Sequence, residues 1–477
     1  MPASQELPAS QRLSFWTKLV YGSGDWSFAS YGTLRQIFYA IFLTDVVGLE
    51  PRLASVAALT GIVWDAVNDP LVGILTDRTR TRLGRRRPFL LFFAIPFGLS
   101  FLLLWWAPPW HSQLALAATV TLAFMLSDTF ETLCEVPFSA LLPELAPDYN
   151  GRTDLTSFRI FFNLLASLVT AVAAPAIIDA ALSAGLTQQQ GYLLVAVLFG
   201  GIAALPILLI VAVVRERYGS IGRLQETASF RQTLRTAWAN IPFRFAAAIY
   251  MLNWITFDLV ALLLPFYLLY WIAGGNLLAT ASVLGISMPL ESAVFALLLI
   301  TAVLALPFWL WLSNRLGKHI AYILGMVFWA GVQIGIFMVR PGNILLVLWM
   351  AFLAGLSVSA AHILPDAMFP DVIELDELRT SRRQEGIYYG VKNFVRKLTG
   401  ALAIFIALQV LGWFGYRTPP KTAATFLQSP PTLTAIRVLI GPFGALLLFS
   451  AVATAWFYPL TKRRHDRIRR MLEKRRK

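Results

Sequence analysis

Residues able to do chemistry gather in the middle of an apolar stretch, residues 53–75. Asp65, Asn68 and Asp69 stand at positions i, i+3 and i+4, so a helix would place all three on one face. Two ionised carboxylates in hydrocarbon need a positive partner. A small cation would supply one, because Na⁺ takes several hard oxygen ligands and a proton binds a carboxylate. A basic residue on another helix is the structural alternative, and the spacing favours the cation site.

The composition predicts an all-α integral membrane protein. Hydrophobic residues make up 57% of the 477 positions, and apolar stretches of about 20 residues recur along the chain. We expect twelve transmembrane helices in two six-helix bundles, with spans near residues 20–47, 53–75, 88–107, 113–142, 156–183, 191–214, 240–272, 289–312, 319–339, 343–366, 385–414 and 434–459.

The placement of positive charge predicts the orientation of the chain. The formal net charge is +14, yet we expect no nucleic-acid partner, because Lys and Arg gather in the connections after even-numbered spans and in the tail. This excess places both termini in the cytoplasm and the protein in the cell inner (plasma) membrane. The basic tail either binds anionic lipid headgroups or anchors the topology.

A short repeat predicts two related halves. Arg-Leu-Gly-Arg at 82–85 precedes the third span, and Arg-Leu-Gly-Lys at 315–318 precedes the ninth. We expect an N-terminal bundle with the cation site at 1–214, a cytoplasmic linker at 215–239, a C-terminal bundle at 240–460 and a basic cytoplasmic tail at 461–477.

The fourth span carries a second polar face. Asp128, Glu131, Thr132 and Glu135 stand at i, i+3, i+4 and i+7, on one side of a helix. Three acids on one face would not point to lipid, so we expect this face to line a cavity and contact substrate. The alternative is ion pairing with the basic residues inside the spans, Arg35, Arg159 and Lys397.

Six motifs carry a resemblance to a known family. They lie at residues 44–49 (TDVVGL), 64–73 (WDAVNDPLVG), 77–80 (DRTR), 84–88 (GRRRP), 136–139 (VPFS) and 371–386. The chain resembles the glycoside–pentoside–hexuronide:cation symporter family of the major facilitator superfamily. The resemblance implies a twelve-helix fold, alternating access, and transport coupled to Na⁺, H⁺ or Li⁺.

The resemblance also implies roles for individual residues. The family binds its cation with both acids and the Asn of the WDxxNDP run plus a fourth-span Thr, here Asp65, Asn68, Asp69 and Thr132. All the Na⁺ ligand types are present, which favours Na⁺ over H⁺. Family members have a lysine at Lys397, a substrate-facing arginine at Arg159 and a sugar-binding acid at Glu135. The substrate-facing set that we expect is Arg35, Asp128, Glu131, Glu135, Arg159 and Lys397.

These features predict a cation-coupled symporter of a sugar, glycoside or sugar acid. Phe28, Ala29 and Ser139 replace residues with which the family's galactoside transporters hold their sugar, so galactosides are disfavoured. Sodium-dependent transporters of lysophospholipids resemble the same family, and that substrate class is the alternative. We expect no enzyme activity, since the four histidines are scattered without a nucleophile or metal partner. The expected partners are a small-molecule substrate, a monovalent cation and membrane lipids, with no cofactor, and we expect a monomer.

Overall fold

The computed structural model describes residues 13–146, 149–214, 238–283, 285–380, 385–420 and 425–460, together with 464, 467, 468, 470 and 471. The expected linker lies outside the described residues apart from 238–239, and most of the expected basic tail lies outside them as well.

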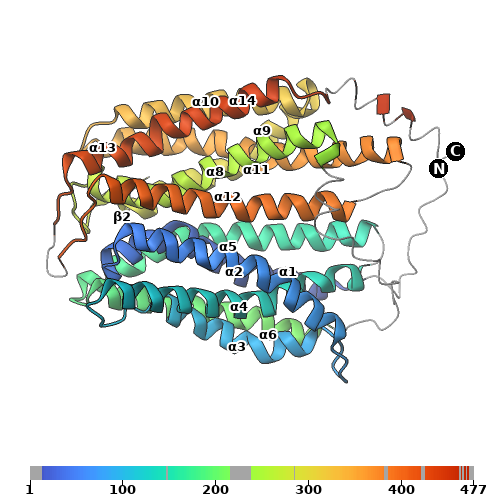
Figure 1. Cartoon of the computed structure of the whole chain (residues 1–477), viewed down its shortest axis with the longest axis horizontal. Coiled ribbons are helices and arrows are strands. Elements are labelled where there is room, and N and C mark those ends of the chain that lie inside the picture. The colour runs from blue at the N-terminus through green and yellow to red at the C-terminus, as the bar shows by residue number, and fades with distance from the viewer. Residues whose placement is uncertain are drawn as a thin grey trace. The chain divides into compact units, whose positions relative to one another are not determined.

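The chain divides into two compact units, Met1–Arg223 (unit 1) and Leu224–Lys477 (unit 2). The elements of unit 1 are α1 (Phe15–Ile41), the π-helical η2 (Phe42–Val47), α2 (Pro51–Arg78), α3 (Arg87–Leu104), α4 (Gln113–Leu145), α5 (Tyr149–Ser183) and α6 (Gln188–Val213) (Figure 1). Those of unit 2 are α8 (Ile241–Phe266), η3 (Tyr267–Ile272), β1 (Thr280–Val283), β2 (Ile286–Pro289), α9 (Leu290–Leu316), α10 (Lys318–Met338), α11 (Ile344–Thr380), α12 (Glu385–Trp413), α13 (Pro430–Val438), η4 (Leu439–Phe443) and α14 (Gly444–Trp456).

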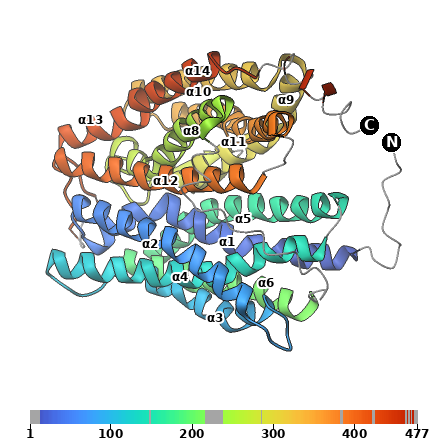
Figure 2. The ribbon, with the colours of Figure 1, turned by 45° about the vertical axis from the view of Figure 1, so that its right-hand side comes forward.

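The helices confirm the all-α membrane class. Within the described residues, eleven helical segments are long and apolar enough to cross a membrane. The α1–η2 segment is also long enough, but Asp25, Arg35 and Asp45 make it more polar than the others. Within unit 1, α1 to α6 lie lengthwise beside one another (Figure 2). The cytoplasmic location of both termini stays a prediction.

The two units share one pattern of helix packing. In unit 1, α1 packs on α5 and α6, α2 packs on α4, and α3 packs on α4 and α6. In unit 2, α8 packs on α12 and α14, α9 packs on α11, and α10 packs on α11 and α14. Helices with the same rank in each unit therefore share these contacts, as expected of a duplicated six-helix unit.

The last residue of each repeated tetrapeptide forms an equivalent ion pair. Arg85 Nη2 lies 2.7 Å from Glu144 Oε1 near the end of α4. Lys318 Nζ lies 2.6 Å from Asp371 Oδ1 of α11, the fourth long helix of unit 2. In each unit, a basic residue at the tetrapeptide before the third long helix binds an acid on the fourth.

Local sequence signals set the ends of α2 and α4. Pro51 occupies the first turn of α2, where its missing N–H costs nothing. Ser112 caps α4 by accepting a hydrogen bond from the backbone of Ala115. The Gln113 side chain then accepts a 2.8 Å hydrogen bond from the Glu50 backbone, which ties the start of α4 to the start of α2.

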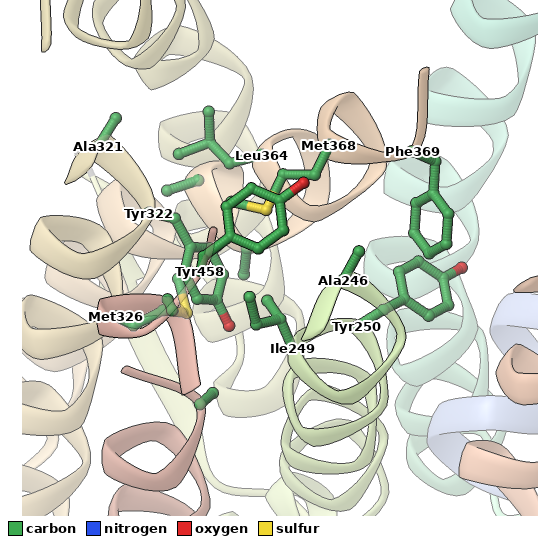
Figure 3. Close-up of a cluster of buried hydrophobic side chains, with 14 of the residues drawn as sticks. Ala246, Ile249, Tyr250, Ala321, Tyr322, Met326, Leu364, Met368, Phe369 and Tyr458 are labelled. Carbon is green, nitrogen blue, oxygen red and sulfur yellow. The ribbon is translucent and has the colours of Figure 1, made fainter. Parts of the chain in front are cut away.

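The core of unit 2 is rich in buried aromatic rings. Tyr250 of α8 and Phe369 of α11 meet edge to face, with ring centroids 5.4 Å apart (Figure 3). Tyr322 and Met326 of α10 are fully buried in another part of the same cluster. Edge-to-face contacts add to the free energy of apolar burial, so this cluster stabilises the packing of α8, α10 and α11.

Candidate functional site

Two contacts hold α2 against α4 at the level of the expected cation site. Gly61 of α2 lies so close to the Phe124 ring of α4 that an added Cβ atom would overlap it. One turn later, the indole N–H of Trp64 donates a 2.9 Å hydrogen bond to Thr129 Oγ1 of α4. Small residues at helix crossings allow this close approach within membranes, and it sets the distance between the two polar faces.

The structure brings expected cation ligands together across this contact. Thr132 Oγ1 donates a 3.3 Å hydrogen bond to Asp69 Oδ1, which joins α4 to α2. Asn68 is 5% exposed, and its amide Nδ2 is buried with no hydrogen bond to a described residue. Asp65 and Asp69 are half-buried. The carboxylate, amide and hydroxyl groups supply hard oxygen donors to one region, as Na⁺ coordination requires.

The local backbone adds to the polarity of this region. Pro70 lies inside α2 and has no N–H, so the carbonyl of Ala66 cannot receive its usual helical hydrogen bond. Among the described residues, no group of three or more His, Cys, Asp or Glu side chains is arranged to hold a metal ion. The donors of this region are carboxylate, amide and hydroxyl oxygens.

Arg35 of α1 binds two acids of the fourth-span face. Its Nη1 lies 3.2 Å from Asp128 Oδ1 and 3.5 Å from Glu131 Oε2. The guanidinium also lies over the rings of Tyr31 and Phe124, at 5.1 and 4.9 Å from their centroids. The Asp128 side chain is only 2% exposed, so in this conformation it holds Arg35 in place and is closed to a substrate.

Arg159 of α5 forms a tighter pair with an acid that the sequence analysis missed. Its Nε and Nη2 donate to Asp25 Oδ2 and Oδ1 of α1 at 2.5 and 3.1 Å. Nη2 also lies 3.5 Å from Ser139 Oγ, and the guanidinium stacks 4.7 Å from the Phe138 ring centroid. A carboxylate inside an expected span, near the start of residues 20–47, was the available signal for Asp25.

Two further expected substrate residues are Glu135 and Lys397. Glu135 is exposed, and it interacts electrostatically with Glu131 and Arg159. It is therefore the acid of the fourth-span face that is most open to a ligand. Lys397 is half-buried on α12 of unit 2, and its role stays a prediction.

A second buried ion pair that the sequence analysis missed lies in unit 2. Arg396 of α12 binds Asp258 of α8 through Nη1 and Nη2, at 2.6 and 3.0 Å. Asp258 is 4% exposed. The resemblance assigns a role to Lys397 but none to Arg396, the residue before it. The sequence therefore gave no reason to pair Arg396 with Asp258.

The spans of unit 1 carry far more negative than positive charge. Within residues 20–41, 53–76, 116–142 and 156–183, the basic side chains are Arg35 and Arg159. The acidic ones are Asp25, Asp65, Asp69, Asp128, Glu131, Glu135 and Asp179. Two arginines cannot neutralise seven carboxylates, and net charge inside a bilayer is costly. Cations or protons bound within unit 1 would reduce this excess of negative charge.

Two units with the same main helix contacts, built from apolar helices long enough to cross a membrane, are typical of secondary transporters of the major facilitator superfamily. Residues 20–462 match the model of the family described as MFS/sugar transport protein, and the chain belongs to that family. The chain is 29% identical to an uncharacterised symporter of Synechocystis, over 99% of both chains.

A vertebrate relative and a solved structure are also similar to this chain. A sodium-dependent lysophosphatidylcholine symporter 1-A of Danio rerio is 25% identical over 98% of this chain and 89% of its own length. The inward-open structure of the xylose transporter XylE from E. coli superimposes with a TM-score of 0.61 at 14% identity, over 94% of this chain and 97% of that one. At that identity the likeness establishes the fold alone.

Proposed function

We propose that this secondary transporter is a cation-coupled symporter of the glycoside–pentoside–hexuronide:cation type. Asp65, Asn68, Asp69 and Thr132 bind the coupling ion, and a sugar, glycoside or sugar acid is carried with it. The observation that supports this most directly is the Thr132–Asp69 hydrogen bond, which joins the polar faces of two helices in an acid-rich unit.

Na⁺ is the coupling ion that we favour, and H⁺ is the alternative. The donors are carboxylate, amide and hydroxyl oxygens, which together can replace the water around an alkali ion. A carboxylate pair without an alkali ion would instead take up a proton, because two close negative charges raise the cost of full ionisation. Several relatives are sodium-dependent by name, which supports Na⁺.

The substrate has two candidate classes. The family description refers to sugar transport, and the exposed Glu135 suits sugar hydroxyls because a carboxylate accepts two hydrogen bonds. Lysophosphatidylcholine symporters are among the relatives, so a lysophospholipid is the second candidate. In either case the protein works in the cell membrane, as a monomer with both termini in the cytoplasm.

Transport into proteoliposomes tests the coupling. We expect an inward Na⁺ gradient to drive accumulation in the wild type, and Asp65→Asn and Asp69→Asn each to abolish it while the protein stays folded by gel filtration. A pH gradient applied without Na⁺ separates proton coupling from sodium coupling. Unchanged accumulation in both variants would remove the cation assignment.

Parallel uptake of radiolabelled glycosides, glucuronides and lysophosphatidylcholine separates the substrate classes. Accumulation of a glycoside or glucuronide supports the first class, and accumulation of the lysolipid alone would replace it with the second.

A further inference from the structure

Basic and aromatic side chains alternate along the contact between α8 and α12 in unit 2. Tyr250, Trp254 and Asp258 stand at i, i+4 and i+8 on α8, and Lys392 and Arg396 stand at i and i+4 on α12. Lys392 Nζ lies 5.3 Å from the Tyr250 ring centroid, and Arg396 Cζ lies 4.0 Å from that of Trp254. We call these five residues the α8–α12 ladder.

A guanidinium has two pairs of parallel N–H donors, which we call its end-on and side-on forks. Arg396 binds the protein through one of them. Nη1 and Nη2 form the end-on fork and bind the two oxygens of Asp258, and Nη1 also lies 3.4 Å from Thr399 Oγ1. Nε makes no hydrogen bond to a described residue. Its N–H and the second N–H of Nη2 form a side-on fork, which matches the two oxygens of a carboxylate or phosphate.

Arg159 in unit 1 binds its acid through the other pair of N–H donors. There the side-on fork is filled, since Nε and Nη2 both donate to Asp25. The Arg159 side chain is 20% exposed, whereas that of Arg396 is 31% exposed over an Asp258 side chain that is 5% exposed. Asp258 in unit 2 is thus buried, whereas the side chain of its partner Arg396 is partly exposed.

Aromatic rings and further charged residues surround Arg396. Trp254, Phe257 and His362 contact one another, and the His362 ring centroid lies 5.0 Å from that of Trp254 and 4.6 Å from that of Phe257. Three basic residues fall within 392–397 of α12; Lys392 is paired with Asp366 of α11 and Arg396 with Asp258. A ligand at the fork would therefore meet positive charge at its anionic group and flat apolar surface beside it.

We propose that Arg396 receives an oxyanion of the transported substrate, a carboxylate or a phosphate, through Nε and Nη2. Asp258 and Trp254 are positioning residues that hold the guanidinium with its side-on fork open. The inference rests on the proposed transport function and narrows its substrates to those with an anionic group, such as a sugar acid or a lysophospholipid.

Matched ligand pairs test the inference with the purified full-length protein. One pair is p-nitrophenyl glucuronide and p-nitrophenyl glucoside; the other is lysophosphatidylcholine and the monoacylglycerol of the same chain length. Each ligand is titrated while the thermal unfolding of the protein is followed, so binding is measured without transport. In one of the two pairs, we expect the ligand with the oxyanion to bind more tightly than the neutral one. If this is the glucuronide pair, the oxyanion is a carboxylate; if it is the lysolipid pair, the oxyanion is a phosphate.

Arg396→Lys keeps the charge but removes the fork. We expect it to weaken binding of the oxyanion-bearing ligand about ten-fold or more, and binding of the neutral ligand about two-fold or less. Arg437→Lys is the matched control, because Arg437 stacks 4.0 Å from the Trp271 ring centroid yet donates to the backbone oxygen of Phe337. This control should keep the wild-type preference.

Two results would overturn the inference: equal binding of charged and neutral members in both pairs, or an unchanged preference in Arg396→Lys. If Arg396→Lys does not fold, Asp258→Asn decides, because a neutral amide holds the guanidinium less firmly and should weaken binding of the oxyanion-bearing ligand more than binding of the neutral ligand. Unchanged oxyanion binding by folded Asp258→Asn would refute the inference. The cation site is tested separately. If Na⁺ stabilises the wild type against thermal unfolding but does not stabilise Asp65→Asn, the cation site is supported whatever the ligand pairs show.

Discussion

Thr132 Oγ1 donates a 3.3 Å hydrogen bond to Asp69 Oδ1, although 63 residues separate them in the chain. The bond joins an acid of α2 to a hydroxyl of α4 at the contact set by Gly61 and Trp64. If a cation binds Asp69, as we propose, this hydrogen bond would couple ion binding to the position of α4.

The hydroxyl of Thr132 should contribute to sodium affinity. We expect Thr132→Val to weaken the apparent affinity for Na⁺ by about three- to ten-fold, since a ligand oxygen and its hydrogen bond are lost. Thr132→Ser keeps the hydroxyl and should retain most of the affinity. Sodium-dependent uptake at a series of Na⁺ concentrations measures the change.

Thr121→Val is the matched control for this prediction. The Thr121 hydroxyl lies on the same helix, but it donates to the backbone oxygen of Ala117 instead of binding Asp69. The control should leave the Na⁺ dependence near wild type. An unaltered Na⁺ dependence in Thr132→Val would show that the hydroxyl is not a ligand.

Asp25 and Arg159 should be strongly coupled in stability. Removing one partner of a buried pair leaves the other charge uncompensated, so we expect Asp25→Ala to lower the free energy of unfolding by about 3 kcal/mol. In the Asp25→Ala/Arg159→Ala double variant, the loss should be well below the sum of the two single losses. Denaturant titration in mixed micelles measures all three. Additive losses would contradict a direct pair.

Gly61 and Gly73 lie on the same helix and should respond differently to an added methyl group. A Cβ atom at Gly61 would overlap the Phe124 ring, whereas Gly73 has open space around it. We expect Gly61→Ala to destabilise the protein by about 1–3 kcal/mol and Gly73→Ala to be neutral or stabilising by up to about 1 kcal/mol. Thermal unfolding of the two variants measures the difference, and equal stability would mean that α2 and α4 are less closely packed than described.

Helical periodicity let the sequence predict which polar residues share a face. Asp65, Asn68 and Asp69 fall on one side of α2 because their spacing matches the helical repeat, a purely local property. The membrane class also followed from the sequence alone, because unsatisfied backbone groups are so costly in hydrocarbon that long apolar stretches must be helical.

Tertiary packing decided which charges meet. Asp25 and Arg159 lie 134 residues apart, and Asp258 and Arg396 lie 138 residues apart. Nothing in local spacing pairs them, because their distance depends on which helices become neighbours and on the rotation of each helix about its axis. The sequence by itself thus determined the helices and their polar faces, and only the packed structure decided that Arg159 has its side-on fork filled while that of Arg396 stays open.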